Sequence, residues 1–447
     1  MMALKRRALV WLASVAAPSL ALLAILLLPT AAGAVTVEKV VSPGGIEAWL
    51  VQDHANPIIA LEASFEGGAA TDPAPKSGLA EMVASLLDEG AGPYDSQAFQ
   101  GKLEDLVIEL GFTAGRDSLH GHLKTLKTNR DTAFELFRLS LTQPRFDKEP
   151  VERIRGQILS GLMRESQDPN SIAGRAWYQA VFPGHPYALS PHGSIDTAKT
   201  IQVGDLRSFV RAQLARDRLV IGVVGDITPA ELAPLLDSTF GSLPAKASLP
   251  AVPETQPKAG GGLQLIDKDN PQTVALFGLP GVKRDDPDWY AAYVMNYILG
   301  GGGFSSRLAE EVREKRGLAY SVYSYLLPME HAGLIVGGVA TENSRFAESV
   351  RLIREEFRRM RDEGPTEAEL ADAKTYLNGS FPLQLDSTAA IAALLVQLQV
   401  DHLGMDFLDR RRERIEAVTL ADAKRAAARL LDPERLTFVA VGRPAGM

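Results

Sequence analysis

The apolar and polar positions of this chain follow one order twice, which predicts two related domains. In the first half, a helical pattern that begins near Asp205 leads into the apolar run 217–225. In the second half, a helical pattern near Asp422 leads into the run 434–442. The two blocks lie 217 residues apart without a gap, and each ends at glycine. Each block predicts a helix followed by a buried strand.

The starts of the two halves match as well. In both halves a Gly-Gly pair precedes two short runs rich in β-branched and aliphatic residues, which predicts two strands. These strands are expected at 46–51, 58–65, 263–266 and 273–278. Each half therefore has the order strand, strand, helix, long helical middle, helix, strand. This order predicts an α+β fold of two homologous domains, each a mainly antiparallel sheet covered by helices.

The composition between these blocks sets the expected boundaries. The stretch 241–262 is rich in proline, alanine, glycine and lysine, which is typical of a linker. We therefore expect a leader, a first domain, a linker and a second domain at 1–34, 35–245, 246–262 and 263–447.

The first residues have the pattern of a secretory signal peptide. Basic residues at 5–7 precede an almost wholly apolar run at 8–29, and Ala32-Gly33-Ala34 then offers the small residues of a cleavage site. We expect cleavage after Ala34 and export, for example to a periplasm. An uncleaved membrane anchor is the alternative, because the apolar run approaches the length of a membrane span. The chain has no cysteine, so the exported fold is not held by disulfides.

Composition and charge narrow the class of partner. Apolar residues make up 46% of the chain and charged residues 23%, which is typical of a globular protein. The formal net charge of -8 is mild, and the basic residues are not clustered. A nucleic-acid partner is therefore not expected.

Four segments, taken in their order, resemble one peptidase family. They are Gly78-Leu79-Ala80 before an amphipathic helix, Pro183-Gly184-His185-Pro186-Tyr187 with Gly193 soon after, the glycine-rich stretch 299–308, and the stretch 311–322. Together with the duplication, they resemble the M16 family of zinc peptidases, whose members include pitrilysin, insulinase and the mitochondrial processing peptidase. The likeness runs from about Val35 to the end. It implies two domains that form half of a clamshell.

The resemblance implies a zinc site whose ligands this chain lacks. Catalytic members carry H-x-x-E-H on a helix, where two histidines bind zinc and the glutamate is the general base. In this chain Glu81, Ala84 and Ser85 stand at those positions. In catalytic members a further glutamate, from a later helix, is the third zinc ligand. Alignment on Arg155 places Gly161 at the position of that glutamate. Alanine and glycine have no ligating side chain, so the resemblance implies a non-catalytic homologue that binds no metal or other cofactor itself.

The seven histidines give no replacement motif, because none lies in an H-x-x-E-H or H-E-x-x-H context. His120 and His122 are the closest pair, and they are expected on the solvent side of one strand. A relocated metal site remains an alternative to the absence of metal.

Residues on the substrate side are retained. Arg313 and Tyr320 occupy the positions of an arginine–tyrosine pair that contacts the peptide in active members of the family. An arginine offers several donors to a peptide carbonyl, and a tyrosine hydroxyl can stabilise an oxyanion. The alternative is that Arg313 pairs with a nearby acid and Tyr320 packs in a strand.

The glycine-rich loop is the second expected substrate contact. Its four consecutive glycines are Gly300, Gly301, Gly302 and Gly303. The non-catalytic subunit of mitochondrial processing peptidase uses a similar loop in substrate recognition, which implies a substrate-binding role here. A flexible turn is the alternative. The resemblance also implies that a strand near 112–123 forms an edge of the cleft, where a peptide could add as a further strand.

The sequence therefore favours a non-catalytic subunit that pairs with an H-x-x-E-H-bearing M16 chain, which would hold the zinc. A homodimer is also possible, and the ligand would be a peptide. One alternative is a structural or peptide-binding scaffold with no proteolytic role. Another is a divergent, self-sufficient metallopeptidase.

Overall fold

A computed structural model describes residues 36–446, so the predicted leader at 1–34 lies outside the described residues. The chain divides into two compact units, Met1–Val37 and Glu38–Met447. In the first unit only Thr36 and Val37 are described, and neither is in a helix or strand. All the helices and strands described below belong to the second unit.

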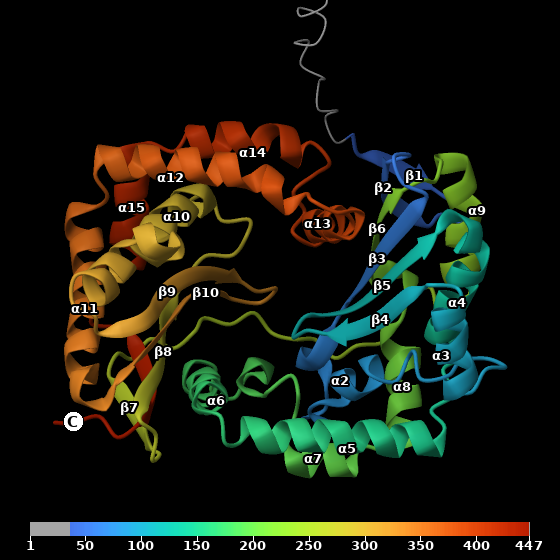
Figure 1. Cartoon of the computed structure of the whole chain (residues 1–447), viewed down its shortest axis with the longest axis horizontal. Helices are drawn as coiled ribbons and strands as arrows, with labels where there is room; N and C mark the ends of the chain where they lie inside the picture. Colours follow the sequence, from blue (N-terminus) through green and yellow to red (C-terminus); the bar gives the residue numbers. More distant parts are fainter. Residues whose placement is uncertain (1–35, 447) are drawn as a thin grey trace, which may run out of the picture. The chain divides into compact units, whose positions relative to one another are not determined.

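The first half forms a six-stranded sheet in the order β1-β2-β6-β3-β5-β4 (Figure 1). All neighbouring strands are antiparallel except the pair β2 and β6. Their bounds are β1 (Glu38–Val41), β2 (Glu47–Gln52), β3 (Ile58–Glu66), β4 (Glu109–Ala114), β5 (Ser118–Leu126) and β6 (Leu219–Gly225).

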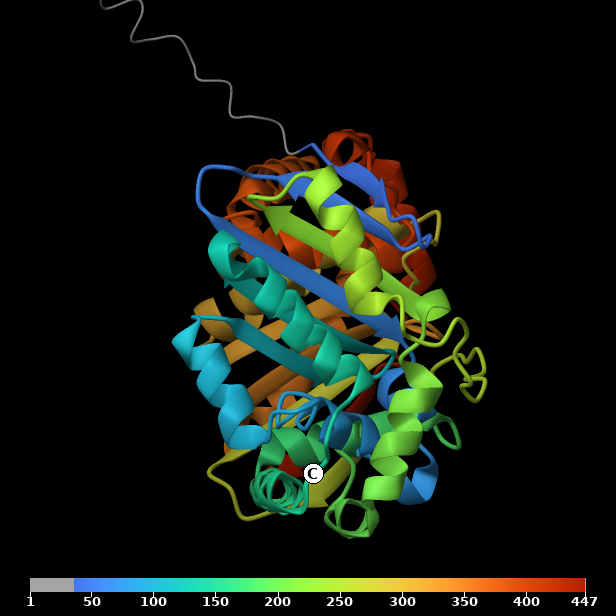
Figure 2. The ribbon, with the colours of Figure 1, turned by 90° about the vertical axis from the view of Figure 1, so that its right-hand side faces the viewer.

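Helices cover the outer face of this sheet. Figure 2 shows α3, α4, α8 and α9 in front of the strands. Between helices and sheet lies a core in which Phe137 stacks on Phe112 at 5.3 Å and meets Phe240 at 6.0 Å. The helices of this half are α2 (Leu79–Ala84), α3 (Ser96–Asp105), α4 (Arg130–Thr142), α5 (Lys148–Glu165), α6 (Pro169–Val181), α7 (Ile195–Thr200), α8 (Val203–Gln213) and α9 (Pro229–Phe240).

The second half repeats the arrangement with a five-stranded sheet in the order β7-β11-β8-β10-β9. Only the pair β7 and β11 is parallel. The strands are β7 (Leu263–Asp267), β8 (Gln272–Pro280), β9 (Ala319–Pro328), β10 (Gly333–Glu342) and β11 (Thr437–Gly442). The helices are α10 (Trp289–Asn296), α11 (Phe346–Glu363), α12 (Glu367–Ser380), α13 (Thr388–Val400), α14 (Phe407–Glu416) and α15 (Leu420–Leu430).

The predicted fold class is confirmed: each half is a mainly antiparallel sheet covered by helices. Two local predictions need correction. The strand expected near 112–123 is a hairpin, in which β4 is the edge strand and β5 its inner neighbour. The apolar spacing of Leu79, Met82, Val83, Leu86 and Leu87 predicts a helix from Gly78 to Asp88, but the helix ends at Ala84, and turns follow it.

Each half places one helix against the sheet of the other half. Helix α13, from the second half, packs on β3 and β6, while α6, from the first half, packs on β8 and β11 (Figure 1). The side chain of Gln399 donates from Nε2 to the carbonyl of Ile221 at 2.9 Å, and Trp177 donates from Nε1 to the carbonyl of Thr437 at 3.1 Å. The contacts of α13 with the first sheet and of α6 with the second sheet thereby connect the two halves.

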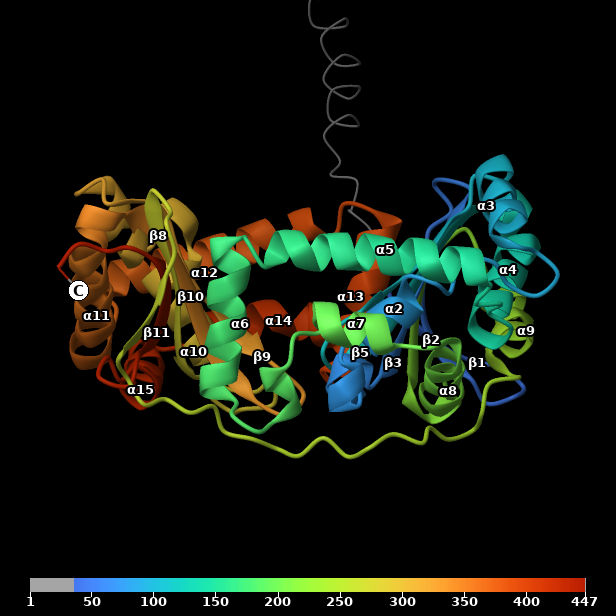
Figure 3. The ribbon, with the colours of Figure 1, turned by 90° about the horizontal axis from the view of Figure 1, so that it is seen from below.

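The stretch predicted as a linker runs as an extended segment between the halves, along the lower edge of Figure 3. It is tied down at several points. The Nε2 atom of His185 lies 2.9 Å from the carbonyl oxygen of Pro253, and the amide of Lys258 donates to the carbonyl of Val181. Glu254 forms ion pairs with His331 and Lys283. The segment is therefore part of the packed structure.

Within residues 36–446, no single helix has both the length and the apolar content needed to cross a membrane. One bent pair, Glu367–Gln384 with Thr388–Val400, meets the criterion of length and composition only when its two members are counted together.

Candidate functional site

The helix that would carry a zinc motif is α2. Its apolar stripe is buried as the sequence predicts, with Leu79, Met82, Val83, Leu86 and Leu87 all at most 5% exposed. The stripe survives the early end of the helix because the turns after Ala84 keep the last two leucines on the same core. The N-terminus of α2 is held by Asp72, whose carboxylate accepts the amides of Gly78 and Ala80.

The four motif positions fall on α2, its end and α5. Glu81 lies in the first turn of α2, Ala84 is its last residue and is buried, and Ser85 is the residue that caps its end. Gly161 lies in α5, where a β carbon would meet only the side chain of Arg164, at 3.9 Å.

The charged neighbours of Glu81 come from the end of α5 and from the loop before α7. Burial raises the pKa of Glu81, the charge of His192 lowers it, and the charge of Glu165 raises it. His192 and Glu165 form an ion pair with 2.9 Å between Nδ1 and Oε1. Glu81, at the first position of the motif, is therefore beside an acid–histidine pair.

This donor set does not fit the zinc site of the catalytic peptidases. Of the four positions, only Glu81 offers a strong ligand, Ser85 offers a hydroxyl, and Ala84 and Gly161 offer nothing. Across residues 36–446, no three His, Asp or Glu side chains gather so that they could hold one metal ion. We therefore derive no chemical step through a metal.

The histidine pair lies on β5, on the face of the sheet opposite the helical core, as expected for alternating strand residues. His120 Nε2 lies 2.7 Å from the Ser118 hydroxyl, and burial lowers the pKa of both His120 and His122. The cross-strand neighbour of His122 is Glu62, whose pKa burial raises to about 7. Burial therefore favours the neutral forms of His120, His122 and Glu62.

The arginine–tyrosine pair is assembled in the second half. The guanidinium of Arg313 lies 4.1 Å from the ring centroid of Phe304 and 5.2 Å from that of Tyr320. Tyr320 is 82% exposed and Phe304 69% exposed. The arginine also has an acid partner, Glu314, at 3.5 Å. The alternative of a tyrosine packed in its strand is wrong, because the Tyr320 ring projects from β9.

Phe304 was not singled out from the sequence. The available signal was a large aromatic residue directly after four glycines, at a place where a simple turn needs no aromatic side chain. In the structure its ring covers one side of Arg313, and so it joins the glycine-rich loop to the arginine–tyrosine pair.

The four glycines have different environments. A β carbon at Gly300 would lie 2.6 Å from the backbone nitrogen of Ser324 in β9, so this glycine allows the loop to pack on the strand. Gly301 and Gly302 face Asn296 and Tyr297. Only Gly303 has a left-handed backbone, with φ of 58° and open space around it. Gly300 and Gly301 thus end a π-helical turn (Tyr297–Gly301) that packs on β9, and space opens only around Gly303.

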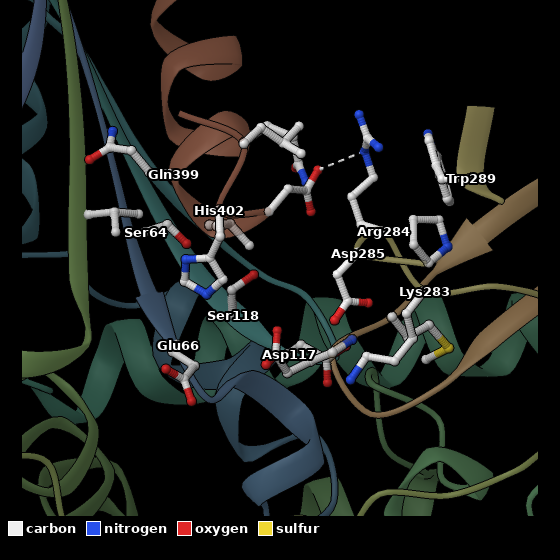
Figure 4. Close-up of a pocket in the computed structure, with 18 of the residues that line it drawn as sticks. Ser64, Glu66, Asp117, Ser118, Lys283, Arg284, Asp285, Trp289, Gln399 and His402 are labelled. Atoms are coloured by element: carbon white, nitrogen blue, oxygen red, sulfur yellow. Dashed lines mark hydrogen bonds and ion pairs between the residues drawn. The ribbon is translucent and has the colours of Figure 1, made fainter. Parts of the chain in front are cut away.

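A cavity of about 1020 Å³ opens between the two halves. Its walls come from the ends of β3, β5 and β9, from the loop before α10, and from the segment that joins α13 to α14. Figure 4 shows this lining, with Ser64, Glu66 and Ser118 on one side and Lys283, Arg284 and Trp289 on the other. The sequence did not predict this cavity, because residues far apart in the chain form it.

The structure thus brings together some of the predicted site residues but not all of them. The glycine-rich loop, Arg313 and Tyr320 form one group. Neither this group nor the degenerate motif on α2 and α5 lines the cavity. In the part of the chain that the structure describes, no hydrogen bond or ion pair joins the motif positions to Arg313 or Tyr320.

Comparison with known proteins connects this arrangement to a family. The family model of the "Peptidase M16 inactive domain" matches residues 200–377. A crystal structure of a peptidase M16 inactive domain from Pseudomonas fluorescens superposes with a TM-score of 0.85 and 29% identity, covering 92% of this chain and 98% of that one. The chain belongs to the M16 family. It is a non-catalytic M16 homologue that lacks the H-x-x-E-H motif.

Curated relatives of this M16 homologue have differing names. The "Non-peptidase homolog YmxG" of Helicobacter pylori is 29% identical over 341 residues, which are 76% of this chain and 78% of that protein. The "Probable mitochondrial-processing peptidase subunit beta" of Schizosaccharomyces pombe is 25% identical over 407 residues, 86% of each chain.

Proposed function

We propose that this M16 homologue is the non-catalytic, peptide-binding subunit of a two-chain peptidase. The observation that carries the proposal is a contrast between two places in the chain. The motif positions on α2 and α5 offer no set of metal donors, while Arg313 lies near the exposed rings of Phe304 and Tyr320. The likeness to a protein named as a peptidase subunit supports a place in a complex, and the likeness to one named as a non-peptidase homologue supports the absence of its own activity.

In this proposal the partner is an M16 chain with an intact H-x-x-E-H motif, which holds zinc and the general base. This chain contributes Arg313 and Tyr320 to the peptide. Aromatic rings beside a guanidinium contact its flat faces and leave its in-plane N–H groups able to donate hydrogen bonds. The edge strand β4 offers unpaired backbone groups for an extended peptide. The predicted leader would place the pair outside the cytoplasm.

Co-purification with such a partner tests the proposal. We expect a complex on size exclusion and a gain in peptide cleavage over the partner alone. Replacing Arg313 with alanine and Tyr320 with phenylalanine should leave the complex intact and lower kcat/KM by about tenfold or more, because a charged donor to the peptide is lost. The matched control is R351A on the exposed face of α11, which should change nothing.

Each of three other outcomes would contradict the proposal. Absence of a complex and of any gain in cleavage would remove the subunit role. A complex whose cleavage ignores the Arg313 and Tyr320 changes would favour a scaffold. Stoichiometric zinc in the purified chain, together with peptide cleavage by that chain alone, would identify a self-sufficient peptidase.

A further inference from the structure

One end of the cavity carries an arginine that makes no hydrogen bond to any residue of the described stretch 36–446. The guanidinium of Arg284 lies 4.6 Å from the Trp289 ring centroid, 5.5 Å from that of Tyr290 and 5.7 Å from that of Phe407. Its side chain is only 14% exposed. The acid paired with it is Asp401, whose Oδ2 lies 3.9 Å from Nε, beyond hydrogen-bond distance. Aromatic faces therefore hold the arginine, and its in-plane N–H groups are free.

Two further arginines lie at the same end. Arg414 packs over the Tyr290 ring at 5.7 Å and forms no hydrogen bond or ion pair within the part of the chain that the structure describes. Arg410 is bound to Asp406, but its buried Nε has no partner among the described residues. The guanidinium groups of Arg284 and Arg414 thus both lie near the ring of Tyr290.

Acidic residues also line this region, and they leave the arginines unsatisfied. Asp286 forms an ion pair with Arg429, with 2.7 Å between Oδ2 and Nη2. The carboxylate of Asp285 points away from the guanidinium of Arg284 in Figure 4. Asp401 approaches only the Nε side, and burial raises its pKa, which favours its neutral form. These acids therefore do not occupy the outer N–H groups of Arg284.

We propose that Arg284 and Arg414 form a carboxylate-binding subsite for a peptide. A guanidinium offers two parallel N–H groups that match the two oxygens of a carboxylate, and such charge-assisted pairs are the stronger hydrogen bonds in proteins. Trp289, Tyr290 and Phe407 would contact the apolar part of the same residue. The carboxylate is either an acidic side chain or the C-terminus of the peptide. This inference rests on the peptide-binding role proposed above.

Strand β9 connects this subsite to the arginine–tyrosine group. Tyr320 lies near the start of β9, and the last residues of the strand, Leu327 and Pro328, line the cavity. Between them Tyr323 and Tyr325 stack at 6.1 Å, and both are more than 40% exposed. At about 3.3 Å per residue, an extended peptide of roughly ten residues would reach from Arg313 to the cavity.

Fluorescence anisotropy on the purified chain without a partner tests the subsite. The probes are fluorescein-labelled peptides of about ten alanine, serine and leucine residues. One series carries a single glutamate near its start, middle or end, with glutamine counterparts. A second pair differs only in a free or amidated C-terminus. We expect at least one carboxylate form to bind about tenfold more tightly than its neutral counterpart. A preference for glutamate over glutamine would identify an acidic side chain as the ligand, and a preference for the free over the amidated end would identify the C-terminus.

Variants of the arginines test whether Arg284 and Arg414 cause the preference for carboxylate peptides. R284Q with R414Q should remove most of the tenfold preference, while R412Q should keep it. Arg412 is the matched control, since it is an exposed arginine on the same helix that does not line the cavity. R414Q alone should weaken the preference without a loss of folding, because Arg414 is exposed. Circular dichroism checks the fold of each variant.

The proposal is overturned if no peptide shows a carboxylate preference, or if the preference survives in R284Q with R414Q. Its failure is separate from failure of the subunit role. A chain that forms no complex with a catalytic partner, but still prefers carboxylates through Arg284, keeps this subsite and loses only the subunit function.

Discussion

At the scale of single residues, Tyr187 connects the two halves. Its ring is fully buried, its hydroxyl donates to Asp117 Oδ1 at 2.6 Å, and its hydroxyl oxygen accepts a hydrogen bond from the amide of His331. Asp117 belongs to the turn between β4 and β5, and it also accepts the amide of Glu330 next to the β10 strand. Burial and the nearby acid raise the pKa of Tyr187, so the hydroxyl keeps its proton and donates.

Replacing Tyr187 with phenylalanine should therefore destabilise the protein by about 1 to 3 kcal/mol, because the carboxylate of Asp117 and the amide of His331 both lose a partner. Urea denaturation measures the loss. The control is Y376F, since the Tyr376 ring is 58% exposed and its hydroxyl makes no hydrogen bond within the described residues. A Y187F stability equal to that of Y376F would show that the hydroxyl is not a structural link.

Prediction from sequence succeeded for residues whose role depends on a local pattern. The buried stripe of α2 follows from helical spacing. Prediction failed where the role depends on distant partners. Nothing near Arg284 in the sequence indicates that Phe407 will pack against it, because that contact joins residues more than a hundred positions apart. Whether Arg313 and the glycine loop bind substrate stays a prediction.

At the scale of elements, the fit of α13 on the first sheet depends on one glycine. Gly222 in β6 faces this helix, and a β carbon there would stand 2.6 Å from the carbonyl oxygen of Ala392 and 3.0 Å from Leu395 Cβ. Backbone atoms cannot turn aside as a side chain can. The second half uses the same device, since a β carbon at Gly278 would meet the Trp177 ring of α6 at 2.5 Å.

G222A should cost about 1 to 3 kcal/mol in the free energy of unfolding, because α13 has to move away from the sheet. The matched control is G156A, since Gly156 lies inside α5, where an added β carbon would have open space around it. That change should stabilise the protein by up to about 1 kcal/mol through a better helix propensity. Chemical denaturation of both variants gives the comparison, and equal effects would contradict the close fit.

Element boundaries were predicted less well than element types. The helical pattern from Gly78 to Asp88 is continuous in sequence, but the helix ends at Ala84 and the leucines that follow are buried from turns. Tertiary packing satisfies the apolar pattern without a continuous helix. Likewise, the strand expected near 112–123 came from the resemblance alone, and in the structure Gly115 and the two residues after it form a tight turn between β4 and β5.

At the scale of the whole molecule, buried acids couple stability to pH. Burial raises the pKa of Glu62 from 4.5 to about 7 and that of Asp88 from 3.8 to about 6. Between the ordinary and the raised pKa, the folded protein holds protons that the unfolded chain has released. The free energy of unfolding therefore falls as pH rises through this window.

E62Q should remove part of this slope, because glutamine does not titrate. Relative to the wild type, the variant should gain about 1 to 2 kcal/mol between about pH 5 and pH 8, after allowance for the partial exposure of Glu62. Urea denaturation at both pH values measures the difference. A wild-type slope unchanged in E62Q would mean that Glu62 is ionised throughout.

The helix exchange between the halves bears on how such a chain could arise. A single ancestral module would leave one face of its sheet bare, and two identical copies could cover each other by trading the helix that is now α6 or α13. Joining the copies in one polypeptide turns that encounter into an intramolecular one, whose effective concentration depends on the length of the connecting segment. Joined copies are free to diverge, because a change in one no longer has to suit both places. Separately expressed halves should accordingly fold best as a mixture.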